Sequence, residues 1–248
     1  MIKFFRKIRQ NLLKEGKTSK YFKYALGEIV LVVIGILIAL QINNWNEEKK
    51  YQKQLEVKMH SILGDMRADG LQIKSLIKDL EKQHSAADHI IPIMESEQKP
   101  IVDSLKFILD FNSFTTTPIL SQQNNTWDYL SANGILSELE DQELVNLLMD
   151  YYNYFDNLSI NFNNSANPVR LELRQLKYEL FTNTEHRKFF PTKNPSIPNK
   201  AVYESIFNDT RILPLCRYIG STATYFEGRF KNAEEKANRI IHHLETHY

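Results

Sequence analysis

The sequence predicts an all-α protein in which one N-terminal transmembrane helix continues into an extracytoplasmic antiparallel helical bundle. Two observations predict this fold class. Every residue from Ile29 to Leu40 is apolar or glycine, which is typical of a membrane-spanning helix. In the rest of the chain, apolar residues recur at steps of three and four, the period of an amphipathic helix. We therefore expect three parts, residues 1–23, 24–45 and 46–248.

The transmembrane helix is predicted over residues 24–45. If Glu28 and Gln41 are tolerated near its ends, the apolar run covers 19 residues, close to the roughly 20 that cross a bilayer core. A cleaved signal peptide is the alternative interpretation. Residues 38–41 read IALQ, however, which lacks the small-residue pattern of a cleavage site. An uncleaved anchor is the better interpretation.

The charges predict how the chain is oriented. Residues 1–25 contain eight Lys or Arg and one Glu, a balance of +7, whereas the other 23 basic and 29 acidic residues sum to −6. Because Lys and Arg beside a span stay in the cytoplasm, we expect the N-terminus inside. Residues 46–248 would then lie outside the inner membrane, in the periplasm of a Gram-negative cell. Their acidic balance also argues against a nucleic-acid partner.

Residues 1–23 are predicted to form a basic amphipathic cytoplasmic segment. Its apolar residues share one helix face and its cations lie largely elsewhere, so we expect it to rest on the anionic inner leaflet. Positive charge that only sets the topology is the alternative. The residues expected to contact the membrane surface are Lys3, Arg6, Lys7, Arg9 and Lys14.

Glu28 lies one turn inside the cytoplasmic end of the predicted span. At headgroup depth its charge would be neutralised by Lys20 or Lys23. The alternative is an assembly contact, because Glu28, Gly35 and Ala39 fall on one helix face. Gly35 and Ala39 form a small-x-x-x-small pair, which lets two helices approach closely. Transmembrane packing in a homo-oligomer is therefore a possible role of this face.

The part after the span is predicted to begin with a long helix over residues 46–85. Its apolar series includes Asp69 at one position. Pro92 and Pro100 are expected to bracket its end. A shorter helix is predicted over residues 103–111.

The middle of the chain predicts two further helices. A polar loop leads into a short helix over residues 126–133, with Gly134 as its left-handed C-terminal residue. Ser137 and Glu140 form an S-x-x-E capping box. They precede a long apolar series from Leu144 to Phe162, which predicts the next long helix.

The last third of the chain predicts a loop and a final helix. Over residues 161–168 the helix either kinks, or breaks and restarts at Pro168. Residues 182–200 contain three prolines and are predicted to form one long loop. The final helix is predicted over residues 214–243. Cys216 is the sole cysteine, so no internal disulfide can form, and we expect it to be buried on this helix.

Aromatic residues mark a possible site in the middle of the chain. Trp127, Tyr129, Tyr151 and Tyr152 could line a pocket for a ligand or form a surface for a partner. Aromatic residues at helical spacing are more often part of an ordinary core. Both interpretations remain open at the level of the sequence.

The sequence predicts no catalytic residue, cofactor or metal ligand. His243 and His247 have the i, i+4 spacing of helical metal sites, but they do not form the H-E-x-x-H signature. Histidine near a helix C-terminus is also favourable because of the helix dipole, so metal binding stays an open question. The sequence contains no phosphate-binding loop, dinucleotide fingerprint, C-x-x-C or G-x-S-x-G motif.

The string GEIVLVVIGILIALQINNWN, from Gly27 to Asn46, is the most specific part of a family resemblance. Residues 1–50 resemble the N-terminus of DUF6090, a family of uncharacterised membrane proteins from Bacteroidota. A looser similarity covers residues 126–152. The resemblance implies a single-pass inner-membrane protein with a helical outer domain, and it implies no activity.

These observations favour a non-enzymatic accessory or scaffold protein that works by protein–protein contact in the cell envelope. Its expected partners are the lipid bilayer and another envelope protein. One alternative is a small-molecule sensing domain that signals through a partner protein, with a closed pocket near Trp127 and Tyr151. A further alternative is an undetected envelope hydrolase, which would need paired carboxylates or a His-lined metal.

Overall fold

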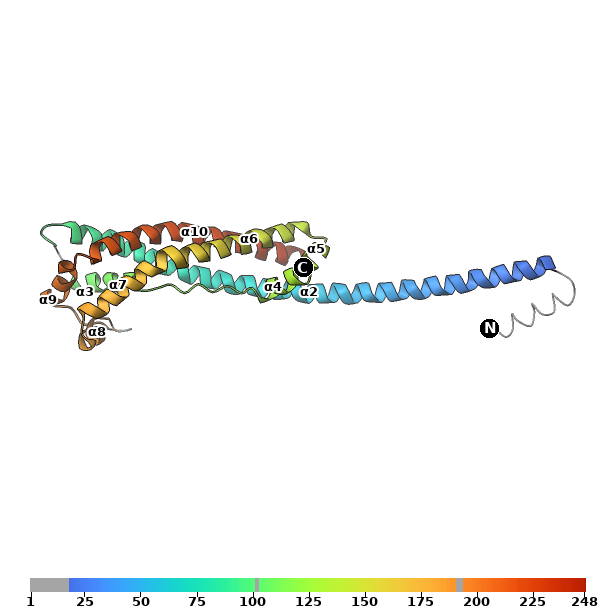
Figure 1. Cartoon of the computed structure of the whole chain (residues 1–248), viewed down its shortest axis with the longest axis horizontal. Helices are drawn as coiled ribbons and strands as arrows, with labels where there is room; N and C mark the ends of the chain where they lie inside the picture. The colour runs from blue at the N-terminus through green and yellow to red at the C-terminus, as the bar shows by residue number, and fades with distance from the viewer. Residues whose placement is uncertain (1–17, 101–102, 191–193) are drawn as a thin grey trace. The chain divides into compact units, whose positions relative to one another are not determined.

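The computed structural model describes residues 18–100, 103–190 and 194–248 (Figure 1). Every regular element within these ranges is a helix, which confirms the predicted all-α class for this part of the chain. Two compact units, Met1–Lys58 and Met59–Tyr248, are distinguished, and each is described by itself. The elements are α2 (Thr18–Glu95), α3 (Ser104–Phe114), α4 (Asn125–Ala132), α5 (Ile135–Glu138), α6 (Gln142–Asn161), the π-helical turn η1 (Phe162–Ala166), α7 (Asn167–Leu180), α8 (Asn183–Phe189), α9 (Lys200–Asn208) and α10 (Ile212–His247).

The described part of the first unit is the N-terminal portion of α2. Its large apolar side chains between Ile29 and Leu40 are all exposed. By length and composition this helix could cross a membrane, and a signal sequence near the N-terminus would have the same character. An apolar surface of this extent costs free energy in water and little in hydrocarbon.

In the second unit, α10 runs antiparallel to α2. Arg67 of α2 lies 2.6 Å from Glu245 near the end of α10, whereas Glu95 lies 2.6 Å from Arg217 near its start. The ion pair between Lys74 and Glu234, at 3.6 Å, falls between these two. The paired residue numbers rise on one helix and fall on the other, so the chain directions are opposite.

The stretch α6–η1–α7 lies along α10, as Figure 1 shows, and it also runs antiparallel to it. Asp150 of α6 pairs with Lys236, and the Tyr218 hydroxyl donates to the Ser165 carbonyl at 3.2 Å. Tyr151 bonds to Asp69 of α2, and Arg170 bonds to Gln83, so α2 and α6–α7 run in the same direction.

The apolar face of α10 forms much of the core of the second unit. The ring of Phe162 packs edge-on against Phe226 and Phe230, with ring centres 4.9 and 5.7 Å apart. At Gly220 the helices α2 and α10 approach closely, because a Cβ there would lie 2.5 Å from the Cβ of Ala87. Buried residues of α10 include Ile219, Ala223, Phe226, Phe230, Ala233, Ala237, Ile240 and Leu244.

A second group of buried apolar residues joins the end of α2 to α3, α7, α8, α9 and the start of α10. Phe107 packs against Tyr203 and Phe207, with ring centres 6.2 and 5.4 Å apart. Cys216 is fully buried in this group, as the sequence predicted. Burial raises the pKa of its thiol to about 12 because the thiolate would lose its hydration.

The helix α2 ends later than the sequence predicted. It continues past Ser85 to Glu95 and contains Pro92. Ile90 is fully buried and Met94 nearly so. Their burial favours a continued helix, while Pro92 removes a single N–H donor close to the helix end.

The predicted capping box at Ser137 and Glu140 is wrong. Ser137 lies inside the short helix α5, where its hydroxyl donates to the Gly134 carbonyl at 2.6 Å. The N-cap of α6 is Asp141, whose side chain accepts from the Leu144 N–H at 2.9 Å. Gly134 has a φ of 71°, and this left-handed residue starts a separate helical turn that takes up Ser137.

Two predictions for the last third also change. The prediction for residues 161–168 left open a kink or a break, and the structure has the π-helical turn η1 there, with Pro168 in the first turn of α7. The predicted loop over residues 182–200 contains α8 and the first residue of α9, so that prediction is wrong over residues 183–189 and at Lys200. Thr182 and Glu185 form a true capping box at the start of α8, and this local hydrogen bonding stabilises a helix too short to show an apolar period.

Candidate functional site

Residues 116–124 have no regular secondary structure and pass along α2. The Gln83 side chain donates to the Thr116 carbonyl at 2.9 Å, and the Gln123 N–H donates to Asp69 at 2.7 Å. Ser121 also bonds to Gln72 between these two points. Because a backbone outside helices and strands needs other partners, side chains of α2 supply them along this segment.

Asp69 is the acidic residue among the side chains of α2 that bond to this segment. It is fully buried, and its second carboxylate oxygen accepts from the Tyr151 hydroxyl at 2.8 Å. Burial raises the pKa of Asp69 to about 6, although the two hydrogen bonds favour the charged form. Burial and the nearby carboxylate in turn raise the pKa of Tyr151, so its hydroxyl remains a proton donor. The pair is a hydrogen-bonded carboxylate inside an apolar core.

The structure brings together three of the four aromatic residues that the sequence singled out. Trp127 stacks on Tyr152, with ring centres 4.6 Å apart and planes 9° apart. Tyr152 meets Tyr151 edge-on at 5.2 Å, and its hydroxyl donates to the Gln123 carbonyl at 3.2 Å. Tyr129 is about half exposed. Together Trp127, Tyr151 and Tyr152 pack around the end of the 116–124 segment.

Arg170 is a second buried charged residue, and no sequence motif pointed to it. It is fully buried, and its Nε and Nη2 donate to the Gln83 side-chain oxygen at 2.9 and 2.7 Å. Its Nη1 donates to the Ala166 carbonyl at 2.9 Å. Its partners within the described residues are neutral oxygens, and burial lowers its pKa to about 10. Gln83 thus links the buried guanidinium to the 116–124 segment.

Lys177 and Arg174 hold the end of α3. Lys177 donates to the side chains of Asn112 and Thr115, at 2.8 Å each. Arg174 donates to the Thr115 carbonyl at 2.7 Å. Burial, with Arg174 nearby, lowers the pKa of Lys177 to about 8. Because α3 has no basic residue in its own last turn, these cations of α7 interact favourably with the negative end of its dipole.

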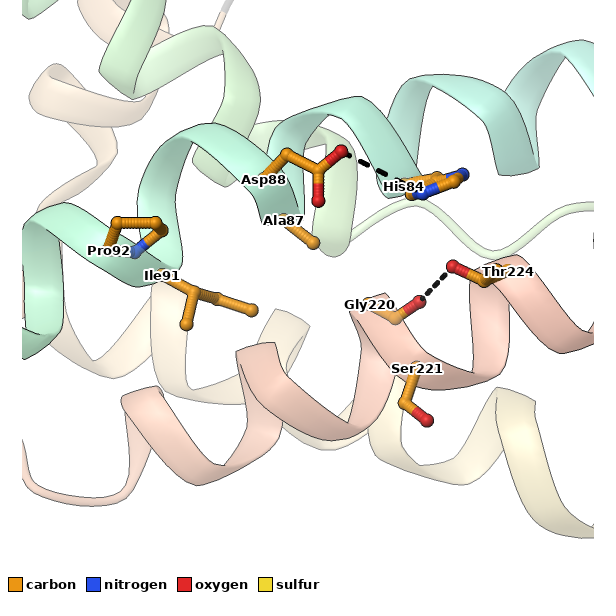
Figure 2. Close-up of a pocket in the computed structure, with 8 residues that line it drawn as sticks. All are labelled: His84, Ala87, Asp88, Ile91, Pro92, Gly220, Ser221 and Thr224. Atoms are coloured by element: carbon orange, nitrogen blue, oxygen red, sulfur yellow. Dashed lines mark hydrogen bonds and ion pairs between the residues drawn. The ribbon is translucent and has the colours of Figure 1, made fainter.

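A groove of about 330 Å³ lies between α2 and α10 (Figure 2). His84 bonds to Glu227 at 3.2 Å and lies 3.8 Å from Asp88. In Figure 2 the Ser221 side chain points away from His84, and the Thr224 hydroxyl donates to the Gly220 carbonyl at 3.2 Å, so neither of these hydroxyls donates to the imidazole. A nucleophile activated by a base would require that contact. The groove is lined by both polar and apolar residues.

A second groove, of about 400 Å³, lies between α2 and the 116–124 segment. Its walls carry amide, hydroxyl and carboxylate groups beside a few apolar side chains. The residues that line it include Gln72, Ser75, Asp79, Thr116, Thr117 and Ser121. Neither groove is lined by Trp127 or Tyr151.

The histidines near the C-terminus contact the start of α6 and each other. His243 is buried and its Nε2 lies 2.7 Å from the Asp141 carboxylate. The ring of His247 stacks on it at 4.3 Å, and its Nδ1 bonds to the His243 carbonyl at 2.9 Å. No group of three or more His, Cys, Asp or Glu suited to a metal ion occurs in the described ranges. The arrangement ties the end of α10 to the start of α6.

The remaining predicted site residues concern the membrane. Lys3, Arg6, Lys7, Arg9 and Lys14 lie outside the described residues. Gly35 and Ala39 are exposed on α2, and a Cβ at Gly35 would meet nothing within 4 Å. The packing of Glu28, Gly35 and Ala39 against a second helix stays a prediction.

The buried charged residues share one signal in the sequence. Asp69 lies between Met66 and Ile73 in an apolar series, and Arg170 and Lys177 flank Leu173 at helical spacing. A charged residue at a core position of an amphipathic helix indicates a buried hydrogen-bonded group. The sequence shows such positions, but it does not show which oxygens they bind.

These features define a class: an all-α protein with a helical unit and an N-terminal helix that could cross a membrane. Residues 28–108 match DUF6090, a family of unknown function. This match supports the family resemblance inferred from the sequence. The matched residues include Asp69 and Gln83, whereas residues 126–152 lie outside the match. Comparisons with curated proteins and with solved structures gave no match.

Proposed function

We propose that residues 24–45 anchor this protein in the inner membrane of a Bacteroidota cell, with the N-terminus in the cytoplasm. Residues 46–248 then lie in the periplasm. The observation that carries this proposal is the exposed apolar stretch of α2, which suits lipid on all sides. Trp45 is also exposed, with the Lys49 ammonium 3.9 Å from its ring centre. Trp is enriched at the membrane–water interface.

The helical unit acts, in this proposal, as a non-enzymatic accessory or scaffold that contacts another envelope protein. Its buried charged groups support this view because Asp69, Arg170 and Lys177 are engaged with neutral groups of the fold. Their chemistry is that of structural hydrogen bonding. Exposed aromatic side chains such as Tyr178 and Tyr225 leave surface for a partner.

A sensing function is the second candidate, and the groove beside the 116–124 segment favours it. Hydroxyl and amide groups that converge on about 400 Å³ suit a small polar ligand. Such a ligand would act on the same segment that Asp69 and Gln83 hold. An envelope hydrolase is the third candidate, and it would have to use the groove at His84 or residues outside the described ranges.

Orientation can be tested with cysteines placed at two exposed positions. We expect Asp88→Cys to react with a membrane-impermeant maleimide in intact spheroplasts, and Ser19→Cys to react only after the membranes are broken. The wild-type chain is the control, because its Cys216 is fully buried. Labelling of Ser19→Cys in intact spheroplasts would reverse the proposed topology.

Partner contact can be tested by crosslinking in native membranes, followed by purification in mild detergent. A deletion variant would not serve to map the partner contact. Removing residues 126–180, for example, would remove α6 and α7 and with them much of the core. Point substitutions at exposed tyrosines leave that core intact. We expect a stoichiometric partner with the wild-type chain, and recovery of the chain alone would contradict the scaffold proposal.

A further inference from the structure

The helices α6 and α10 present a surface of tyrosine and arginine, which we call the aromatic–arginine surface. Tyr154 contributes from α6, and Tyr218, Tyr225 and Arg229 contribute from α10. Tyr225 is 59 % exposed and Tyr218 is 42 % exposed. Tyr154 is partly buried and donates to the Arg229 carbonyl at 3.0 Å, which ties the two helices together at this point.

Arg229 is held between two of these rings. Its guanidinium carbon lies 5.1 Å from the ring centre of Tyr154 and 6.0 Å from that of Tyr225. Its Nε is buried and has no hydrogen-bond partner in the described part of the chain. The rings orient the planar group, and its donors have no carboxylate of the described residues as an ion-pair partner.

Other arginines of the unit differ from Arg229. Arg67 pairs with Glu245, Arg211 with Asp209, and Arg217 with Glu95. Lys236 lies 5.2 Å from the Tyr154 ring centre and pairs with Asp150. Arg229 therefore stands out on this surface as a partly exposed guanidinium that is oriented by aromatic rings and lacks an acidic partner within the described ranges.

An oriented guanidinium binds a carboxylate through two parallel N–H···O bonds. Tyr and Arg are also enriched among the residues that dominate binding energy at protein interfaces. We propose that the aromatic–arginine surface binds an acidic segment of a partner protein, with a carboxylate at the Arg229 guanidinium. This inference rests on the proposed function, because it names the surface and the chemistry of that partner contact.

The test uses the full chain in detergent micelles and a fluorescein-labelled decaglutamate peptide as the probe. We expect saturable binding by fluorescence anisotropy that weakens as salt rises. Arg229→Glu should weaken it roughly tenfold or more, and Arg229→Gln should weaken it by a smaller factor. Arg239→Glu is the matched control, because Arg239 is also on α10 and exposed, and we expect a change of less than about twofold.

Three results would overturn the inference. Equal binding of decaglutamine would show that carboxylates are not recognised. Equal losses in the Arg229→Glu and Arg239→Glu chains would show that general charge attraction, and not this surface, accounts for binding. Absence of decaglutamate binding to the wild-type chain would also contradict an acidic partner.

The crosslinking experiment separates this inference from the proposed function. If the partner recovered from native membranes is retained by the Arg229→Glu chain, the scaffold proposal stands and the surface assignment fails. If the wild-type chain recovers no partner, the proposed function fails as well. Loss of the partner with Arg229→Glu, together with its retention by Arg239→Glu, supports both.

Discussion

The Tyr151 hydroxyl lies 2.8 Å from the Asp69 carboxylate, deep between α2 and α6. These residues are far apart in the sequence, and their contact fixes the register of two helices that run in the same direction. The other carboxylate oxygen of Asp69 accepts from the Gln123 N–H at 2.7 Å. One buried charge therefore holds two helices and the 116–124 segment together.

Stability should depend on pH through Asp69. The pKa of Asp69 is about 6 in the folded chain, whereas its ordinary value is 3.8. Between pH 3.8 and 6 the folded state therefore binds more protons than the unfolded state. The free energy of unfolding should therefore fall as pH rises from about 4 to 6, by up to ~3 kcal/mol from this group. Asp69→Asn should remove this slope and raise stability at pH 7. Urea unfolding followed by circular dichroism at several pH values measures both, and an unchanged slope in the variant would contradict the assignment.

Gln83 and Arg170 should be energetically coupled. Arg170→Met leaves the Gln83 oxygen without its two donors, and Gln83→Leu leaves the buried guanidinium underpaired. We expect each single change to cost about 2–4 kcal/mol. The double variant should cost less than their sum by about 1–3 kcal/mol. Additive losses in a double-mutant cycle of urea unfolding would show that the two side chains act independently.

The close approach at Gly220 should not tolerate a side chain. Gly220→Ala places a Cβ 2.5 Å from that of Ala87, so we expect a loss of about 1–3 kcal/mol. The matched control is Gly228→Ala on the same helix, where a Cβ meets nothing within 4 Å. That change should stabilise the chain by about 0.5–1 kcal/mol. Thermal unfolding of both variants compares them directly, and similar effects in the two would refute the contact.

Asp141 should couple the start of α6 to the end of α10. Its carboxylate accepts from the Leu144 N–H and contacts His243. Burial alone would raise the pKa of Asp141, but these partners lower it overall. Its contribution to stability is therefore present near neutral pH and lost as pH falls below its ordinary value of 3.8. Asp141→Ala should cost about 1–2 kcal/mol at pH 7. Asp156→Ala is the control, because Asp156 is an exposed residue of the same helix, and equal losses in the two would refute this role.

The helical class, the apolar stretch at Ile29 to Leu40 and most helix positions could be read from the sequence. These features follow from local periodicity, because apolar residues on one face of an amphipathic helix recur every three or four positions. The apolar series from Leu144 to Phe162 and the burial of Cys216 were both confirmed. Short elements such as α5 and α8 were missed because they contain too few residues to show a period.

The directions of the long helices and the partners of the buried charges became visible only in the folded structure. Whether Asp69 meets a cation, a metal or a tyrosine depends on which helix lies beside it, and that choice is made by packing over the whole unit. The same holds for Arg170, which faces the amide of Gln83, and for Arg229, which lies between two tyrosine rings. Contacts across such long separations leave no periodic trace in the chain, because they arise from shape complementarity and desolvation between helices.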